Sequence, residues 1–166
     1  MTAVSHVMVP IDHNGRIAVD PTREEVVSDS LFPGSAPVAV RLDQGIPGLS
    51  EATSWTMSPL ESGDADPPTF FELTDEAASL TLVVADPWMF FGDYAPDLPD
   101  SELESLDIRQ ATDAAVFCTV TLDGAEDCIY LNLLGPLVFH VGTGNGRQLV
   151  LGDQDWPVRA RVDLPA

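Results

Sequence analysis

The chain has 166 residues, 45% of them apolar, and a formal net charge of −20. This length is sufficient for one domain over residues 1–166 that buries about 70% of the surface of its unfolded chain. The chain has 27 acidic residues and only seven basic ones, all arginine. This excess of negative charge disfavours direct nucleic-acid binding and membrane docking. A basic protein partner is favoured, and the alternative is that the charge serves solubility alone.

The N-terminal residues lack the positive region and the long apolar run of a signal peptide. Elsewhere the apolar runs are shorter than the ~18 residues that a membrane-spanning helix needs. We therefore expect a soluble, cytoplasmic protein. Cys118 and Cys128 lack the spacing of a zinc or redox site, and we expect both to be buried, reduced thiols.

Most of the chain has the pattern of short strands separated by turns. A first hairpin is predicted from residues 6–10 and 16–20, which flank Asn14-Gly15, and a long loop from residues 21–37. One short helix is predicted over residues 99–106, with Asp100 as its cap. Further strands are predicted over 37–42, 53–57, 69–73, 80–85, 115–122, 128–134, 137–141, 148–151 and 156–162. This pattern indicates a mainly β barrel or sandwich with a single core.

The clearest hairpin joins residues 115–122 to residues 128–134 through a five-residue loop, with Leu122 opposite Cys128. In this register Asn132 lies in an apolar row opposite Cys118. A buried amide must find partners, so we expect Asn132 to hold the backbone of a neighbouring loop. The same register keeps the two thiols beyond the reach of a disulfide.

Residues 82–94 combine a strand, a chain reversal and four aromatic rings. The strand is apolar on both faces, which is typical of a central strand, and Asp86-Pro87 ends it because proline cannot donate to the ladder. The following Trp88 to Phe91 are too apolar to be left in water. Two interpretations stay open: a plug that closes one end of the barrel or sandwich, or an exposed patch for a partner.

No residue pattern predicts a catalytic, cofactor or metal site. The acidic loop with Asp64 and Asp66 lacks the length and the flanking helices of an EF-hand. The glycine-rich residues 142–147 lead into a strand and not a helix, so a hairpin tip is favoured over a phosphate loop. His140 has no nucleophile or carboxylate at a suggestive spacing. With so many carboxylates, an acid pair of the glycoside hydrolase kind remains an alternative.

A series of motifs resembles the flagellar assembly factor FliW family. Its strongest parts are the central VVADPWMFFGDY, with its DP-x-x-FF-x-DY, and the NLL-x-P of LNLLGPLVF. GIPGL, TFFEL, RQLVL and DWPVR stand in the same order around them, and the resemblance is strongest over residues 41–162. The chain departs from the family where Leu42-Asp43 precedes the glycine turn and where Arg147 alone remains basic in the last hairpin tip.

This resemblance implies a small antiparallel β-barrel of about ten short strands with one short helix, without enzymatic activity. It also implies two competing partners: flagellin, which the family keeps from misassembling, and the RNA-binding translational regulator CsrA, which the family antagonises when the host has it. An acidic surface would steer the protein toward a basic regulator. The alternative is an acidic adaptor or decoy for another basic protein.

The resemblance carries over two sets of residues. The structural motif comprises Gly45, Pro47, Gly48, Asp86, Pro87 and Pro136. The candidate partner-binding residues among them are Phe90, Phe91, Tyr94, Asn132, Leu133 and Arg159, and the neighbouring Trp88 of the aromatic segment is a further candidate.

Overall fold

The computed structural model describes residues 6–8, 37–60 and 69–164. The second strand of the predicted N-terminal hairpin and the predicted loop 21–37, apart from residue 37, lie outside these residues. The strands are β1 (His6–Met8), β2 (Val38–Leu42), β3 (Ser54–Pro59), β4 (Phe70–Asp75), β5 (Thr81–Ala85), β6 (Asp97–Pro99), β7 (Ala114–Asp123), β8 (Cys128–Leu131), β9 (Leu137–His140), β10 (Asn145–Gln148) and β11 (Ala160–Asp163). The helix α2 (Asp100–Ser105) and two 3₁₀ turns, η2 (Pro87–Met89) and η3 (Ala111–Asp113), complete the described elements.

Seven strands close into a ring, in the order β7, β5, β4, β3, β2, β10 and β9, and back to β7. The predicted barrel is therefore confirmed. Its pairings are antiparallel except that of β10 with β2, which is parallel. The predicted hairpin partner of β1, residues 16–20, lies outside the described residues. Among the described strands, β1 pairs with β6.

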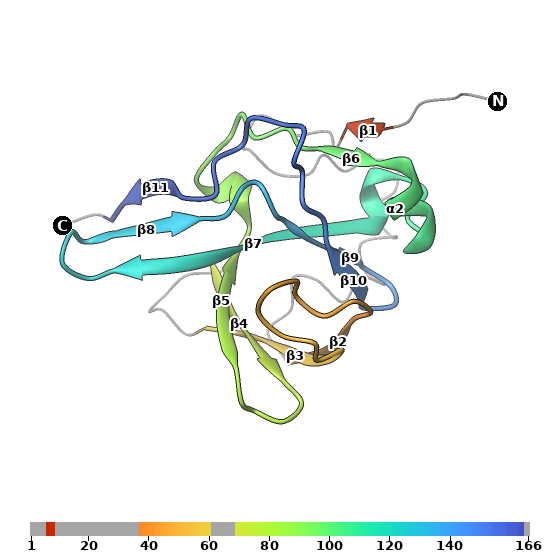
Figure 1. The fold of residues 1–166 in the computed structure, drawn as a ribbon, viewed down its shortest axis with the longest axis horizontal. Helices are drawn as coiled ribbons and strands as arrows, with labels where there is room; N and C mark the ends of the chain where they lie inside the picture. The colour runs from red at the N-terminus through yellow and green to blue at the C-terminus, as the bar shows by residue number, and fades with distance from the viewer. Residues whose placement is uncertain (1–5, 9–36, 61–68, 165–166) are drawn as a thin grey trace.

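The long strand β7 serves both the barrel and an extension from it. Its first residues pair with β9, its middle pairs with β5, and its last residues pair with β8. Beyond the barrel, β7, β8 and β11 continue as a three-stranded arm, which projects away from the other strands (Figure 1). We call these three strands the arm.

The barrel wall separates two hydrophobic clusters, where the sequence predicted a single core. Alternate side chains of a strand point to opposite faces, and Phe117 packs inside the barrel while Val116 and Cys118 pack outside it. The inner cluster includes Trp55, Met57, Leu73 and Phe139. The outer cluster lies between the wall and a cover made by η2, β6, α2 and the C-terminal segment.

Three local predictions were wrong. Cys128 lies opposite Asp123 and not Leu122, so the hairpin loop is one residue shorter than predicted. The side chain of Asp100 does not cap α2, because Pro99 takes the cap position and Asp100 is the first helical residue. The strand predicted at 148–151 is β10 at Asn145–Gln148, which begins within the predicted hairpin tip.

The last predicted strand is shorter than expected, since β11 begins at Ala160 and the residues from Trp156 to Arg159 precede it. Both cysteines are free and buried, as predicted. Cys118, however, lies opposite Ala85 of β5 and not opposite Asn132.

Candidate partner-binding site

The chain reversal after β5 is built by Asp86 and Pro87. The Asp86 carboxylate accepts a hydrogen bond from the backbone N–H of Trp88 at 2.9 Å, which caps η2. Pro87 occupies the first turn, where its missing N–H costs no hydrogen bond. Both residues thus have the structural role that the sequence predicted.

Trp88 and Tyr94 then fix the segment against the outer side of the barrel wall. The indole N–H of Trp88 donates to the carbonyl of Tyr94 at 2.6 Å, and the Tyr94 hydroxyl donates to the carbonyl of Leu133 at 2.7 Å. The Tyr94 ring packs edge-on against Trp156 with centroids 4.8 Å apart. Burial raises the pKa of Tyr94, which keeps its hydroxyl protonated as a donor. The segment therefore covers the side of the barrel, and the interpretation as an end plug was wrong.

Phe90 and Phe91 are only half-buried, and they extend an apolar surface on the wall. Phe90 stacks on Phe70 of β4 with ring centroids 5.8 Å apart. On the same side of the sheet, Val83 lies opposite Val120, and the alternation places Leu122 of the arm next in that row. The side chain of Leu122 is 67% exposed. We call Phe70, Val83, Phe90, Val120 and Leu122 the outer apolar face.

Asn132 follows β8 directly and holds the turn there. Its side-chain oxygen accepts hydrogen bonds from the backbone N–H groups of Leu134 at 3.1 Å and Gly135 at 3.0 Å. The expected role of tying down backbone is confirmed, although the loop is its own. The turn directs Leu133 into the outer cluster, where its carbonyl meets Tyr94.

Arg159 lies on the other side of the arm. Its guanidinium sits over the ring of Tyr130 at 4.0 Å from the centroid, and its side chain is exposed. A cation over an aromatic face is held in place while its outer surface stays available.

The seven predicted contact residues thus divide by burial. Trp88, Tyr94 and Leu133 are buried in the outer cluster and leave no surface for a partner in this conformation. Phe90, Phe91, Asn132 and Arg159 keep exposed surface, and their role as contacts stays a prediction.

Three residues of the structural motif, Gly45, Pro47 and Gly48, lie in the turn after β2. Gly45 and Gly48 adopt φ values of +63° and +78°, on either side of Pro47. A Cβ on Gly45 would collide with the carbonyl oxygen of Ser50, the residue that forms a bridge with Ile46.

The last residue of the structural motif, Pro136, is buried where the chain bends into β9.

Arg147 is a structural centre that the sequence analysis missed. Its side chain is 9% exposed and forms a two-pronged pair with Asp43, including Nε to Oδ1 at 3.0 Å, and a further pair with Glu102 of α2. This guanidinium lowers the pKa of Asp43, chiefly through the hydrogen bonds. Arg147 stands in a glycine-rich stretch, and local sequence patterns do not reveal partners as distant in the chain as Asp43.

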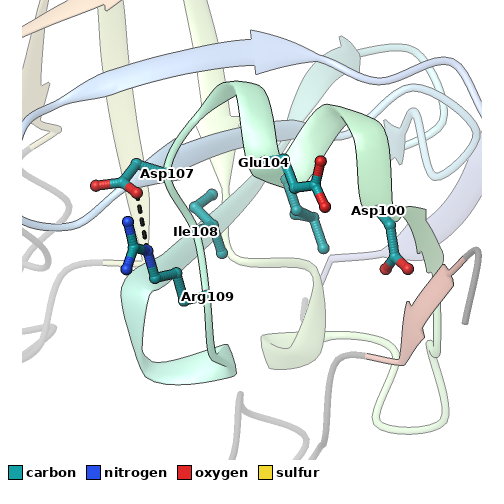
Figure 2. Close-up of a pocket in the computed structure, with 6 residues that line it drawn as sticks. Asp100, Glu104, Asp107, Ile108 and Arg109 are labelled. Atoms are coloured by element: carbon teal, nitrogen blue, oxygen red, sulfur yellow. Dashed lines mark hydrogen bonds and ion pairs between the residues drawn. The ribbon is translucent and has the colours of Figure 1, made fainter. Parts of the chain in front are cut away.

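A shallow pocket of about 420 Å³ opens beside α2. Leu103 and Ile108 supply its apolar lining, and the carboxylates of Asp100, Glu104 and Asp107 surround it (Figure 2). Arg109, the one cation in its lining, pairs with Asp107 at 3.0 Å. The pocket therefore carries excess negative charge.

One group of possible metal ligands occurs in the part of the chain that the structure describes, namely Asp123, Glu126 and Cys128. Asp123 already accepts backbone N–H groups of the turn, and Glu126 pairs with Arg161 at 2.7 Å. These bonds, together with the hairpin register that places Cys128 opposite Asp123, explain why the three lie together.

Comparison with known proteins identifies the family. The family model described as FliW protein matches residues 33–162. The chain belongs to the FliW family. Its members include the flagellar assembly factor FliW of Geobacillus thermodenitrificans, 31% identical over 74% of this chain and 83% of the relative. The protein of the same name from Clostridium novyi is 30% identical over 72% and 82%.

The family fold is also found in a solved structure. The crystal structure of the flagellar assembly factor FliW aligns with a TM-score of 0.68 and 29% identity, covering 76% of this chain and 86% of that one. Both the predicted family and the predicted β-barrel are thereby confirmed. In the described part of the chain, none of the helices has the length and apolar content to cross a membrane.

Proposed function

We propose that this FliW-family protein binds flagellin on the outer apolar face and keeps it from misassembling in the cytoplasm. The observation that carries the proposal is the half-buried Phe90–Phe70 stack, continued by Leu122, on a highly charged protein. Such apolar surface is costly in water unless a partner covers it. An amphipathic helix laid along the wall would cover aromatic and aliphatic side chains together.

The same protein antagonises CsrA, the RNA-binding translational regulator, by exchanging partners. The net charge of −20 favours association with a basic protein, and the acidic pocket beside α2 gives that charge a concave surface. Flagellin and CsrA compete, so export of flagellin frees the protein to act on CsrA. An acidic adaptor or decoy for another basic protein is the second candidate, and the identity of the partner distinguishes the two.

The protein acts as a binder and not as an enzyme. A glycoside hydrolase needs a carboxyl group with a raised pKa as its acid. The pKa of Asp43 and of Asp75 is instead lowered, by hydrogen bonds from Arg147 and from Ser79 respectively. These two carboxylates are thus held ionised by structural partners.

Calorimetric titration with the host's own flagellin, and separately with CsrA, tests the proposal at low and at high salt. We expect flagellin binding to persist at high salt because its contact is apolar, and CsrA binding to weaken because its contact is electrostatic. Prior saturation with flagellin should abolish CsrA binding. If neither protein binds at micromolar concentrations, the proposal fails.

A pair of matched variants locates the flagellin surface. Leu122→Gln removes an exposed apolar side chain from the outer apolar face, whereas Val150→Gln does so on a loop outside it. Burying a leucine contributes about 1.5–3 kcal/mol, so the first variant should weaken flagellin binding about tenfold or more. Val150→Gln should bind as the wild type does, and equal effects of both variants would place the contact elsewhere.

A further inference from the structure

The strand β11 forms one margin of the sheet. It pairs with β8 on one side, and no other strand of the described residues pairs with its outer side. The arm carries this margin away from the barrel (Figure 1). An open strand edge is a template for another strand.

The register identifies which backbone groups of β11 face outward. Leu164 donates its N–H to the carbonyl of Asp127, and Val162 and Ala160 follow at alternate positions opposite Ile129 and Leu131. In an antiparallel ladder, alternate residues direct their backbone groups to the same neighbour. Arg161 and Asp163 therefore direct their N–H and C=O groups toward the open edge.

The side chains on this edge are complementary to their own two-fold copy. If a second β11 pairs antiparallel about Val162, then Arg161 of each copy lies opposite Asp163 of the other. These are the residues whose backbone groups face outward, so each such pair would be a hydrogen-bonded one with opposite charges. Both side chains are exposed, and within one copy Arg161 already contacts Asp163 at 2.8 Å.

The other face of the strand is complementary as well. Val162 and Leu164 pack beside the outer cluster, on the same side as Ile129. Two-fold pairing would bring Val162 against its own copy and join the apolar faces of two arms.

We propose that β11 pairs with β11 of a second copy of this chain, forming one continuous antiparallel sheet across a two-fold axis at Val162. This self-association goes beyond the proposed binding of flagellin and CsrA and does not depend on it. The edge is short, and stable interfaces bury about 1,000 Å² or more, so the dimer is weak and reversible. The net charge of −20 on each copy opposes it, so salt strengthens it.

Sedimentation equilibrium of the purified full chain tests the pairing, without either partner. The wild type should approach twice its monomer mass as its concentration rises toward millimolar at high salt. Arg161→Asp places Asp opposite Asp, and Asp163→Arg places Arg opposite Arg, so each variant alone should stay monomeric. An equimolar mixture of the two should recover the dimer, because every pair across the axis is again one acid and one arginine.

A matched control separates this register from general charge effects. Asp153→Arg changes the net charge as Asp163→Arg does, but on an exposed loop. Alone, it should dimerise at least as well as the wild type, because its β11 edge is unchanged, whereas Asp163→Arg alone should stay monomeric. A wild type that stays monomeric throughout would overturn the proposal, and so would a mixture of Arg161→Asp and Asp163→Arg that remains monomeric.

Discussion

The Tyr94 hydroxyl joins the chain reversal to the turn after β8. It donates to the Leu133 carbonyl at 2.7 Å between two residues that are fully or almost fully buried. Deleting one partner of a buried hydrogen bond leaves the other unsatisfied, and this costs more than the bond contributes. The Tyr94 hydroxyl therefore contributes to stability at this junction.

Tyr94→Phe should lower the free energy of unfolding by about 1–3 kcal/mol, because the Leu133 carbonyl loses its donor while the ring packing is kept. Urea denaturation followed by tryptophan fluorescence measures the change. Tyr130→Phe is the matched control, since its ring lies partly exposed under Arg159 and can remain there. Equal losses in both variants would contradict the assignment.

The two glycines of the turn after β2 differ in what surrounds them. Gly48 has open space where a Cβ would be, whereas Gly45 faces the Ser50 carbonyl. Gly48→Ala should therefore cost about 1–2 kcal/mol of unfolding free energy, from the left-handed backbone alone. Gly45→Ala should cost clearly more in the same urea titration, and a smaller loss at Gly45 would show that the turn relaxes.

At the scale of elements, Arg147 connects three parts of the fold. It lies on β10 and pairs with Asp43, just after β2, and with Glu102 of α2. The parallel pairing of β10 with β2 closes the barrel at this place. The ion pairs thus tie the helix to the junction that closes the ring.

Stability should depend on acid pH through Asp43. Its pKa in the folded state is lowered by Arg147 from an ordinary value of 3.8, so the folded state favours the ionised carboxylate. The resulting stabilisation is complete above the unfolded-state pKa and is lost as the pH falls through the lower, folded-state pKa.

Asp43→Asn should therefore be less stable than the wild type at neutral pH, and the difference should shrink as the pH falls below about 4. Unfolding free energies measured against pH for both proteins give this difference. Asp153→Asn, at an exposed loop position, is the control and should show little difference at any pH. A constant gap for Asp43→Asn would exclude the proposed linkage.

At the scale of the whole molecule, repulsion within a charge of −20 opposes the folded state. Raising the concentration of sodium chloride should therefore raise the Tm, and the rise should level off once the Debye length falls to a few ångströms, about 3 Å at 1 M. Differential scanning calorimetry measures this. A variant with exposed Glu76, Asp93, Glu104 and Asp153 changed to amides should show a smaller rise. A Tm that falls with salt would mean that attractive pairs outweigh the repulsion.

The sequence by itself determined the mainly β class, the positions of most strands, the burial of both cysteines and the family. Alternation, turn residues and proline act over a few neighbours, so they can be read locally. Asn132 was interpretable for the same reason, since a short polar side chain bonds to nearby backbone.

Only the tertiary structure decided which side of the barrel wall each apolar residue occupies. Residues 114–118 are apolar at every position, so alternation separates two faces without telling which faces the barrel interior. Only the tertiary structure likewise decided that Trp88 and Tyr94 are buried while Phe90 stays partly exposed. The pairing of Arg147 with Asp43 joins residues 104 apart in the chain, and only ring closure brings them together.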